Sequence, residues 1–134
     1  MVEAHGDRGV TLKPEEKVRA AIIDYVHARG WHTEVMHGNA FQVGIPDLYL
    51  YNHKWGQRWV DAKVLGRYSF TKAQKIKWPE WERAGIGIWI LVAGTQEEYD
   101  KLFGPPNFRS YWKASWGVLP DVNALLEGLN NGDS

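Results

Sequence analysis

An uninterrupted apolar run over residues 86–93 constrains the fold of this chain more than any other feature of its sequence. A run of Ile, Trp and Val without polar alternation is typical of a strand buried inside a sheet. The preceding stretch, residues 71–78, has helical character, and Pro79 either kinks that helix or starts a new turn that ends by Gly85. A helix that leads into a buried strand indicates a mixed α/β domain.

Periodic patterns predict the remaining elements of this domain. Apolar residues recur at helical spacing after Pro14, and Gly30 follows them as a stop signal. Two strands that flank the turn-forming residues 52–57 should form a hairpin. In chain order we expect a helix over 14–29, strands over 31–36, 47–51 and 58–62, the helix from 71, the strand over 86–93, a short helix over 96–103, a break at 104–107, an undecided stretch at 111–116 and a terminal helix over 121–129.

The length of 134 residues fits one domain, which can bury enough surface to fold without crosslinks. The absence of cysteine excludes disulfides, zinc–thiolate sites, iron–sulfur clusters and cysteine nucleophiles, and it suits a reducing cytoplasm. No apolar run approaches the roughly 20 residues of a membrane span, and the polar N-terminal stretch lacks a signal-peptide core. We therefore expect a soluble, cytoplasmic protein with no membrane partner.

The charges balance over the whole chain, with 16 basic and 16 acidic residues, but they are unevenly distributed. Residues 53–83 carry a net charge of +5, whereas the segments on either side are net acidic. Such a basic segment gives one face suited to polyanions, or it is the solvated side of a hairpin and a helix. The eight tryptophans can stack on bases, but most lie in apolar strings and are expected in the core.

The residues best suited to catalysis or metal binding are Asp47, Asp61 and Lys63. Asp61 and Lys63 are two positions apart in a strand, so their side chains point the same way. A hairpin centred on Lys54 places Asp47 opposite Asp61, with about 5 Å between their Cβ atoms. Two carboxylates at that distance repel each other unless a cation lies between them, and Mg²⁺ binds carboxylate oxygens. Lys63 could then orient a water molecule or offset the charge of a phosphate.

A structural interpretation of the same residues is also open. Asp61 and Lys63 could form an ordinary surface ion pair, and Asp47 could be a turn residue after Pro46. However, Asp61 follows Arg58-Trp59-Val60 in a strand that should be half-buried, where an unpaired carboxylate is costly. That position favours a metal site.

The first helix offers a third carboxylate. At about 100° per residue, Glu15 falls on the edge of the apolar stripe that includes Val18 and Ile22, while Glu16 faces water. Acidic residues in a first helical turn also interact favourably with the helix dipole. The dipole explains Glu16 fully and Glu15 only in part, so we expect Glu15 to be the carboxylate aimed at the sheet.

Gln74 has two interpretations that the sequence does not separate. Thr71-Lys72-Ala73-Gln74 fits a capping box, in which the Gln side chain reaches back to the first residue of the helix. Gln74 could equally serve a site on the sheet. The basic segment supplies candidate phosphate contacts, namely Lys54, Arg58, Arg67, Lys72 and Lys75.

The order of these motifs resembles the PD-(D/E)xK nuclease superfamily. It runs from Glu15 through Gly44-Ile45-Pro46-Asp47 and Asp61-Ala62-Lys63 to Gln74. Within the superfamily, the spacing and the terminal Gln most resemble VRR-NUC domains and the Holliday-junction resolvases of archaea and phages. The resemblance spans about residues 14–93. It implies a restriction-endonuclease-like core of a helix, a three-strand meander, a helix and a strand, which a short helical extension over about 96–134 follows.

By this resemblance, the protein is a divalent-metal-dependent DNA endonuclease that hydrolyses phosphodiester bonds, with branched DNA as one implied substrate. Lys63 would position the attacking water, and Gln74 would help to orient the site. One departure is Asp61, because these subfamilies more often carry Glu there. The implied ligands of Mg²⁺ or Mn²⁺ are Asp47, Asp61, Glu15 and the main-chain carbonyl of Ala62.

The expected partner is DNA, and no small-molecule cofactor is expected because the chain has no phosphate-binding glycine loop and no dinucleotide fingerprint. We also expect a homodimer, since two cuts in opposed strands need two active sites and since Trp and Tyr are enriched at interfaces. The alternatives are a non-catalytic nucleic-acid-binding module on the same fold and an aromatic face that binds carbohydrate or peptide. The resemblance to phage enzymes leaves a phage origin open.

Overall fold

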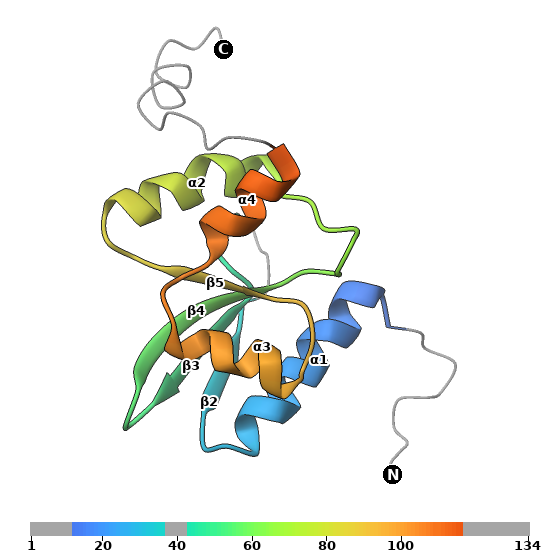
Figure 1. The fold of residues 1–134 in the computed structure, drawn as a ribbon, viewed down its shortest axis with the longest axis vertical. Helices are drawn as coiled ribbons and strands as arrows, with labels where there is room; N and C mark the ends of the chain where they lie inside the picture. Colours follow the sequence, from blue (N-terminus) through green and yellow to red (C-terminus); the bar gives the residue numbers. More distant parts are fainter. Residues whose placement is uncertain (1–11, 37–42, 117–134) are drawn as a thin grey trace, which may run out of the picture.

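The computed structural model describes residues 12–36 and 43–116 of the chain. These residues form a four-stranded mixed sheet with helices on both of its faces (Figure 1). The prediction of a mixed α/β domain is therefore confirmed. The terminal helix expected over 121–129 lies outside the described residues. No helix in the described ranges is long and apolar enough to cross a membrane.

The sheet combines an antiparallel meander with one parallel strand. Its strands, in the order in which they lie side by side, are β2 (His32–Val35), β3 (Leu48–Asn52), β4 (Gly56–Ala62) and β5 (Ile88–Leu91). The first three pair antiparallel, and β5 runs parallel to β4. Leu48 pairs with Val60 in the β3–β4 hairpin, so the hairpin is centred on Lys54 as predicted, and the next residues outward, Asp47 and Asp61, face each other.

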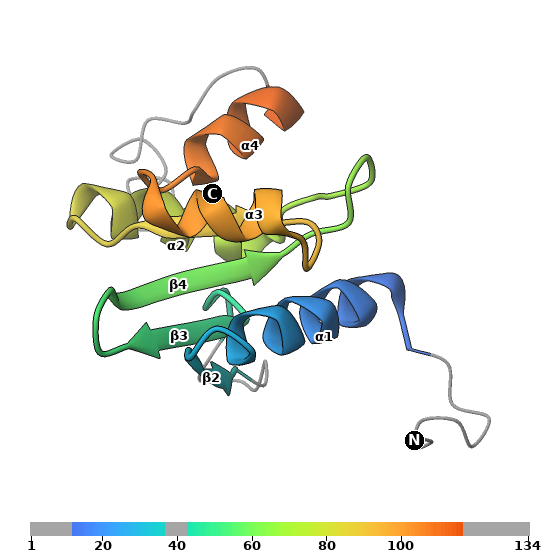
Figure 2. The same ribbon diagram turned by 60° about the horizontal axis from the view of Figure 1, so that its bottom comes forward.

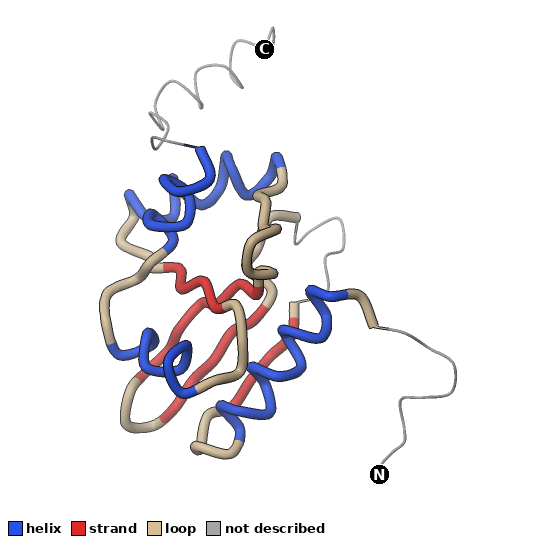
Figure 3. The backbone as a smooth tube through the Cα atoms, turned by 45° about the vertical axis from the view of Figure 1, so that its right-hand side comes forward, coloured by secondary structure: helices blue, strands red, loops and turns tan. Residues whose placement is uncertain are grey.

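The helices are α1 (Pro14–His27), α2 (Lys72–Arg83), α3 (Gln96–Asp100) and α4 (Phe108–Trp116), with a 3-10 turn η1 (Lys101–Phe103) after α3. Helix α2 runs through Pro79 before the chain reaches Gly85 at φ +87°. The stretch at 111–116, which the sequence leaves undecided, belongs to α4. Figure 2 shows α1 running along β3 and β4, and Figure 3 shows the strands lying between the helices.

Apolar side chains fill both faces of the sheet. On one face Ile22 and Val26 of α1 pack with Leu50 and Val60. The other face carries a cluster of buried residues from β5, α2, α4 and the chain before α2, and its members are Phe70, Trp78, Ile88, Ile90, Phe108 and Trp112. The tryptophans Trp31, Trp78 and Trp112 are buried as expected, whereas Trp55 is 44% exposed.

β5 is buried even though it lies at the edge of the sheet. The Asn107 side chain accepts a hydrogen bond from the Ile90 amide at 2.6 Å and donates one to the Ile90 carbonyl at 3.1 Å. Glu98 Oε1 accepts from the Val92 amide at 2.8 Å. These side chains thus form hydrogen bonds with main-chain groups along the edge of β5. Without them, the same groups would be free to pair with another strand.

Candidate functional site

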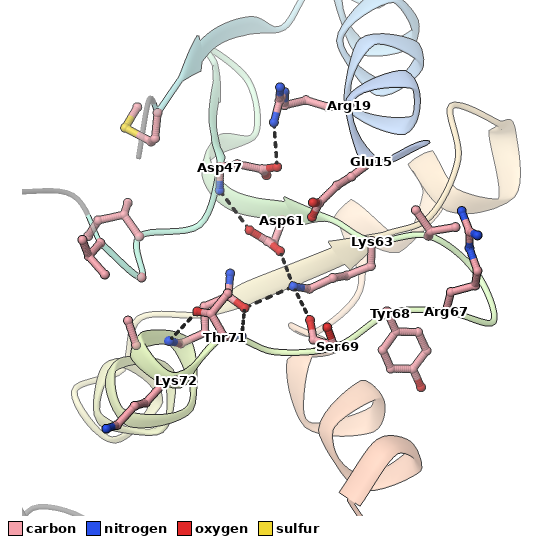
Figure 4. Close-up of a pocket in the computed structure, with 17 residues that line it drawn as sticks. Glu15, Arg19, Asp47, Asp61, Lys63, Arg67, Tyr68, Ser69, Thr71 and Lys72 are labelled. Carbon is pink, nitrogen blue, oxygen red and sulfur yellow. Dashed lines mark hydrogen bonds and ion pairs between the residues drawn. The ribbon is translucent and has the colours of Figure 1, made fainter. Parts of the chain in front are cut away.

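A cavity of about 630 Å³ opens where β3 begins and β4 ends, at the opposite end of the hairpin from its turn (Figure 4). Its walls come from α1, from the two strand ends, from the chain between β4 and α2, and from α2 itself. All five side chains that the sequence proposes as catalytic line this cavity, namely Glu15, Asp47, Asp61, Lys63 and Gln74. Ala62 does not line it, although its amide contacts Asp47.

Asp47 and Asp61 tie the two strand ends together through hydrogen bonds to the main chain. The Asp47 amide donates to Asp61 Oδ1 at 3.0 Å, and the Ala62 amide donates to Asp47 Oδ1 at 3.1 Å. Each Oδ2 atom faces a cation, with Arg19 Nη1 3.4 Å from Asp47 and Lys63 Nζ 3.1 Å from Asp61. Because Asp61 Oδ2 receives no hydrogen bond of good geometry, its lone pairs remain open to a further ligand.

Burial raises the proton affinity of both carboxylates. Desolvation raises the pKa of Asp61, whose exposure is 2%, and the ammonium group of Lys63 opposes this rise. Desolvation and the neighbouring Asp61 carboxylate raise the pKa of Asp47 to about 8, against the opposing effects of the Ala62 amide and Arg19. The negative charge of Glu15 raises both pKa values slightly. Without a cation, the pair therefore holds a proton at neutral pH.

Lys63 is buried, and its ammonium group donates two hydrogen bonds and forms one ion pair. Its Nζ atom lies 3.1 Å from Asp61 Oδ2, donates to the Ser69 carbonyl at 2.8 Å and donates to Gln74 Oε1 at 3.1 Å. The Phe70 ring lies beside it, with its centroid 5.0 Å from Nζ. Asp61 and Lys63 thus share a face as predicted, and they form a buried ion pair rather than a surface one.

Gln74 both caps helix α2 and contacts Lys63 in the cavity. Its amide donates to Thr71 Oγ1 at 3.1 Å, and its Oε1 accepts from the Thr71 amide at 3.0 Å, so the predicted capping box is present. The same Oε1 atom accepts from Lys63 Nζ. The cap at the start of α2 therefore also fixes the acceptor that holds the lysine beside the acid pair.

Glu15 and Glu16 occupy different places. The Glu15 side chain points toward Asp61 across the cavity in Figure 4. Glu16 Oε1 accepts from the Lys13 amide at 3.0 Å and lines only an adjoining hollow of about 570 Å³. Glu15 therefore lines the cavity as expected, but Glu16 does not face water as predicted, because Glu16 is half-buried and Glu15 is the exposed residue of the two. The part of Glu15 in any chemistry stays a prediction.

Arg19 is a cavity residue that the sequence analysis missed. It lies one helical turn after Glu15, so the two side chains share a face of α1 and both line the cavity. The same helical wheel that selected Glu15 gives this signal. Arg19 supplies the positive charge nearest to Asp47 and partly offsets the rise in its pKa.

The five predicted phosphate contacts fall into two groups. Arg67 and Lys72 line the cavity, whereas Lys54, Arg58 and Lys75 do not. Lys54 lies in the turn at the far end of the hairpin. Arg58 donates to the main-chain carbonyls of Trp55, Gln57 and Leu102, which gives it a role in holding the hairpin to η1. The structure therefore places neither Lys54 nor Arg58 at the cavity.

The donor chemistry of the cavity suits a hard divalent cation. Carboxylate oxygens from Asp47, Asp61 and Glu15 are the ligands that Mg²⁺ and Mn²⁺ prefer. Within residues 12–36 and 43–116, no three His, Asp or Glu side chains are gathered tightly enough to enclose a metal ion on their own. Mg²⁺ usually keeps several waters and needs only one or two carboxylates, so the acid pair fits it.

Comparisons of the chain with protein-family models, with curated proteins and with solved structures find no match. Fold and site therefore define the class from geometry alone. The chain is a mixed α/β domain whose β-hairpin presents the half-buried Asp47, the buried Asp61 and the buried Lys63 to an open cavity.

Proposed function

We propose that this protein is a divalent-metal-dependent DNA endonuclease with the restriction-endonuclease-like core of the PD-(D/E)xK superfamily. The observation that carries the proposal is the acid pair, in which Asp47 and Asp61 face each other at an open cavity with raised pKa values and with Lys63 beside them. Titratable groups that burial and a neighbouring charge perturb in this way, and that border a cleft, are candidates for a functional site.

The order of elements supports the same assignment. Helix α1 precedes the β2–β3–β4 meander, and α2 then leads to β5, which is the order of the proposed core. The acid pair lies where β3 and β4 meet the cavity, and Gln74 lies on the helix that follows. Sequence order and spatial grouping therefore agree, although the motifs are far apart along the chain.

A Mg²⁺ or Mn²⁺ ion held by Asp47 and Asp61, with Glu15 and the Ala62 carbonyl as further ligands, would supply Lewis-acid stabilisation of phosphate charge. Asp61, Ser69 and Gln74 hold the Lys63 amine beside the acid pair. Its role is to orient the attacking water and to offset the charge that develops on the phosphate.

Arg67 and Lys72 border the same cavity from the chain before α2 and from the first turn of α2. Cationic side chains in these positions bind the phosphates that flank the cleaved bond and so position the strand. The opposite wall carries Arg19, which adds a third positive charge. The cavity thus combines carboxylates at its floor with cations at its rim.

A cleavage assay on duplex, single-stranded, flapped and four-way DNA, with Mg²⁺, Mn²⁺ or EDTA, tests this function. We expect metal-dependent cleavage that Asp47→Asn and Asp61→Asn each reduce at least about a hundredfold. Asp24→Asn is the matched control, because Asp24 is an exposed carboxylate on α1 outside the cavity and should leave cleavage unchanged. DNA binding without any cleavage would favour the non-catalytic module, and cleavage that both acid-pair variants retain would refute the proposed site.

A further inference from the structure

The turn between β4 and α2 carries the most exposed large hydrophobic side chain in the described part of the chain. Leu65 is 71% exposed, and the next in rank, Val43, is 48% exposed. The Arg67 amide donates to the Val64 carbonyl at 3.0 Å and closes the turn, while Gly66 adopts φ +81°. A glycine with positive φ is what the second central position of a type II turn requires. The turn therefore holds Leu65 at its outer corner.

The base of this turn is anchored on both sides. Lys63 Nζ donates to the Ser69 carbonyl at 2.8 Å, and the Tyr68 ring packs against the rings of Phe70 and Tyr111 at centroid distances of 6.2 and 5.3 Å. A Cβ atom added to Gly66 would meet nothing within 4 Å. The tip of the turn is therefore exposed while its base is held in place, so the Leu65 side chain projects into solvent from an anchored turn.

The turn stands at the border of the candidate active site. Val64 and Arg67 line both the 630 Å³ cavity and the adjoining 570 Å³ hollow. Leu65 follows Lys63 by two residues, which limits the distance between their Cα atoms to about 7 Å. Figure 2 shows the chain after β4 projecting beyond the end of that strand. A ligand bound in the cavity would therefore lie close enough to contact the Leu65 side chain.

The charges around the turn define what kind of partner covers it. Lys13 borders the adjoining hollow together with Glu15 and Glu16, Lys72 borders the cavity, and Arg19 and Arg67 border both, so basic side chains outnumber acidic ones around the hollow. A partner that contacts these basic side chains and Leu65 together carries negative charge on its outside and offers an apolar layer at the centre. Stacked bases between two phosphate backbones have this character.

We propose that Leu65 is an apolar wedge that inserts between bases next to the cleaved phosphate, and that Arg67 contacts the DNA backbone beside it. This inference rests on the proposed endonuclease function and assigns to Leu65 the selection of DNA in which a base step is unpaired or unstacked. Leucine and other apolar wedges unstack base steps in known protein–DNA contacts. Insertion is least costly where a base is already unpaired, so the wedge confers selectivity for such sites.

The test compares paired and interrupted substrates, each with 2-aminopurine at the step expected to meet Leu65. Binding is followed by 2-aminopurine fluorescence in Ca²⁺, and cleavage is followed in Mg²⁺. We expect the wild-type protein to cleave the interrupted substrate about tenfold faster than the paired one and to raise the fluorescence of the interrupted substrate. Leu65→Ser should abolish both differences, whereas Leu65→Met should keep them. Ile86→Ser is the control, because Ile86 is 39% exposed and lies outside both hollows.

The outcomes separate the wedge from the endonuclease function. If the wild-type protein cleaves DNA but Leu65→Ser keeps the same substrate preference and the same fluorescence change, the wedge is refuted and the endonuclease function stands. If the wild-type protein cleaves no DNA with any divalent metal, both fail. Arg67→Gln should instead weaken binding to both substrates alike and lower the salt slope of binding by about one, as expected for one phosphate contact.

Discussion

Replacing Asp47 by Asn should stabilise the metal-free protein at alkaline pH and remove its response to divalent cations. The amide side chain retains an acceptor for the Ala62 amide, which donates to Asp47 Oδ1 at 3.1 Å. The substitution also removes the negative charge at position 47, which the Asp61 carboxylate repels. The contact with Arg19 at 3.4 Å is also lost, but it is partly exposed and should contribute less than about 1 kcal/mol.

The sign of the effect follows from the raised pKa of Asp47. Between its usual value of 3.8 and about 8, the folded protein binds this proton more tightly than the unfolded chain does. The free energy of unfolding of the wild type therefore falls as the pH rises through this window and becomes level above it. At about 1.4 kcal/mol per pH unit the upper limit is roughly 6 kcal/mol, and because Asp47 and Asp61 share the proton we expect about 2–4 kcal/mol.

Thermal unfolding in EDTA from pH 5 to pH 9 measures this difference. The melting temperature of the Asp47→Asn variant should exceed that of the wild type by a margin that grows from pH 5 to pH 8, at roughly 3–4 °C per kcal/mol for a domain of this size. Mn²⁺ at a hundred times its dissociation constant should add about 2.7 kcal/mol to the wild type and little to the variant. Melting temperatures that run parallel from pH 5 to pH 8 would refute the reasoning.

The remaining predictions concern single contacts and assembly. Glu15→Gln should reduce cleavage rates more than Glu16→Gln, because Glu15 lines the cavity and Gln at position 16 still accepts from the main chain; equal losses would show that Glu15 has no special part. Arg58→Ala should lower the melting temperature with little change in DNA affinity, since its guanidinium holds three carbonyls, whereas a weakened affinity at unchanged stability would contradict this. Light scattering should give twice 15.4 kDa if the expected homodimer forms, and a mass of one chain with full activity would exclude it.

The hairpin register was predictable because a strand has a strict period of two and the turn residues fix its centre. Once the turn was centred on Lys54, the opposition of Asp47 and Asp61 followed, and the structure has this register. The phase of α1 was predictable for a similar reason, since the apolar stripe orients the helix and Glu15 lies at its edge. Periodicity therefore placed four of the site side chains before any tertiary information was available.

The limits of β5 were less predictable. The apolar run over 86–93 suggested a longer strand than Ile88–Leu91. Ile86 instead belongs to the turn after α2, where its amide donates to the Trp81 carbonyl at 2.9 Å, and it is 39% exposed. Apolar composition did not reveal that β5 lies at the sheet edge, because Asn107 and Glu98 cover that edge from distant parts of the chain.

Contacts made by long side chains were beyond the sequence pattern. Arg58 was expected to bind phosphate because it belongs to the basic segment, yet it reaches the Leu102 carbonyl 44 residues away. Gln74 was assigned either to a cap or to a site, because sequence spacing does not show that one oxygen can accept from both Thr71 and Lys63. Charge counts along a segment cannot separate arginines that bind the main chain from arginines that face a cavity.

The properties of the site share one cause in the position of Asp61. It lies between Val60 and Ala62, both fully buried, in a strand paired on one side with β3 and on the other with β5. Its carboxylate cannot reach water without breaking that pairing, so the fold keeps it beside Asp47. Burial there raises the pKa of Asp61, and Lys63 forms an ion pair with it. A divalent cation must displace the shared proton, and its affinity should therefore rise with pH until about 8, the pKa of Asp47. If the proposed cation binds, proton binding, cation binding and stability are coupled through the same two carboxylates.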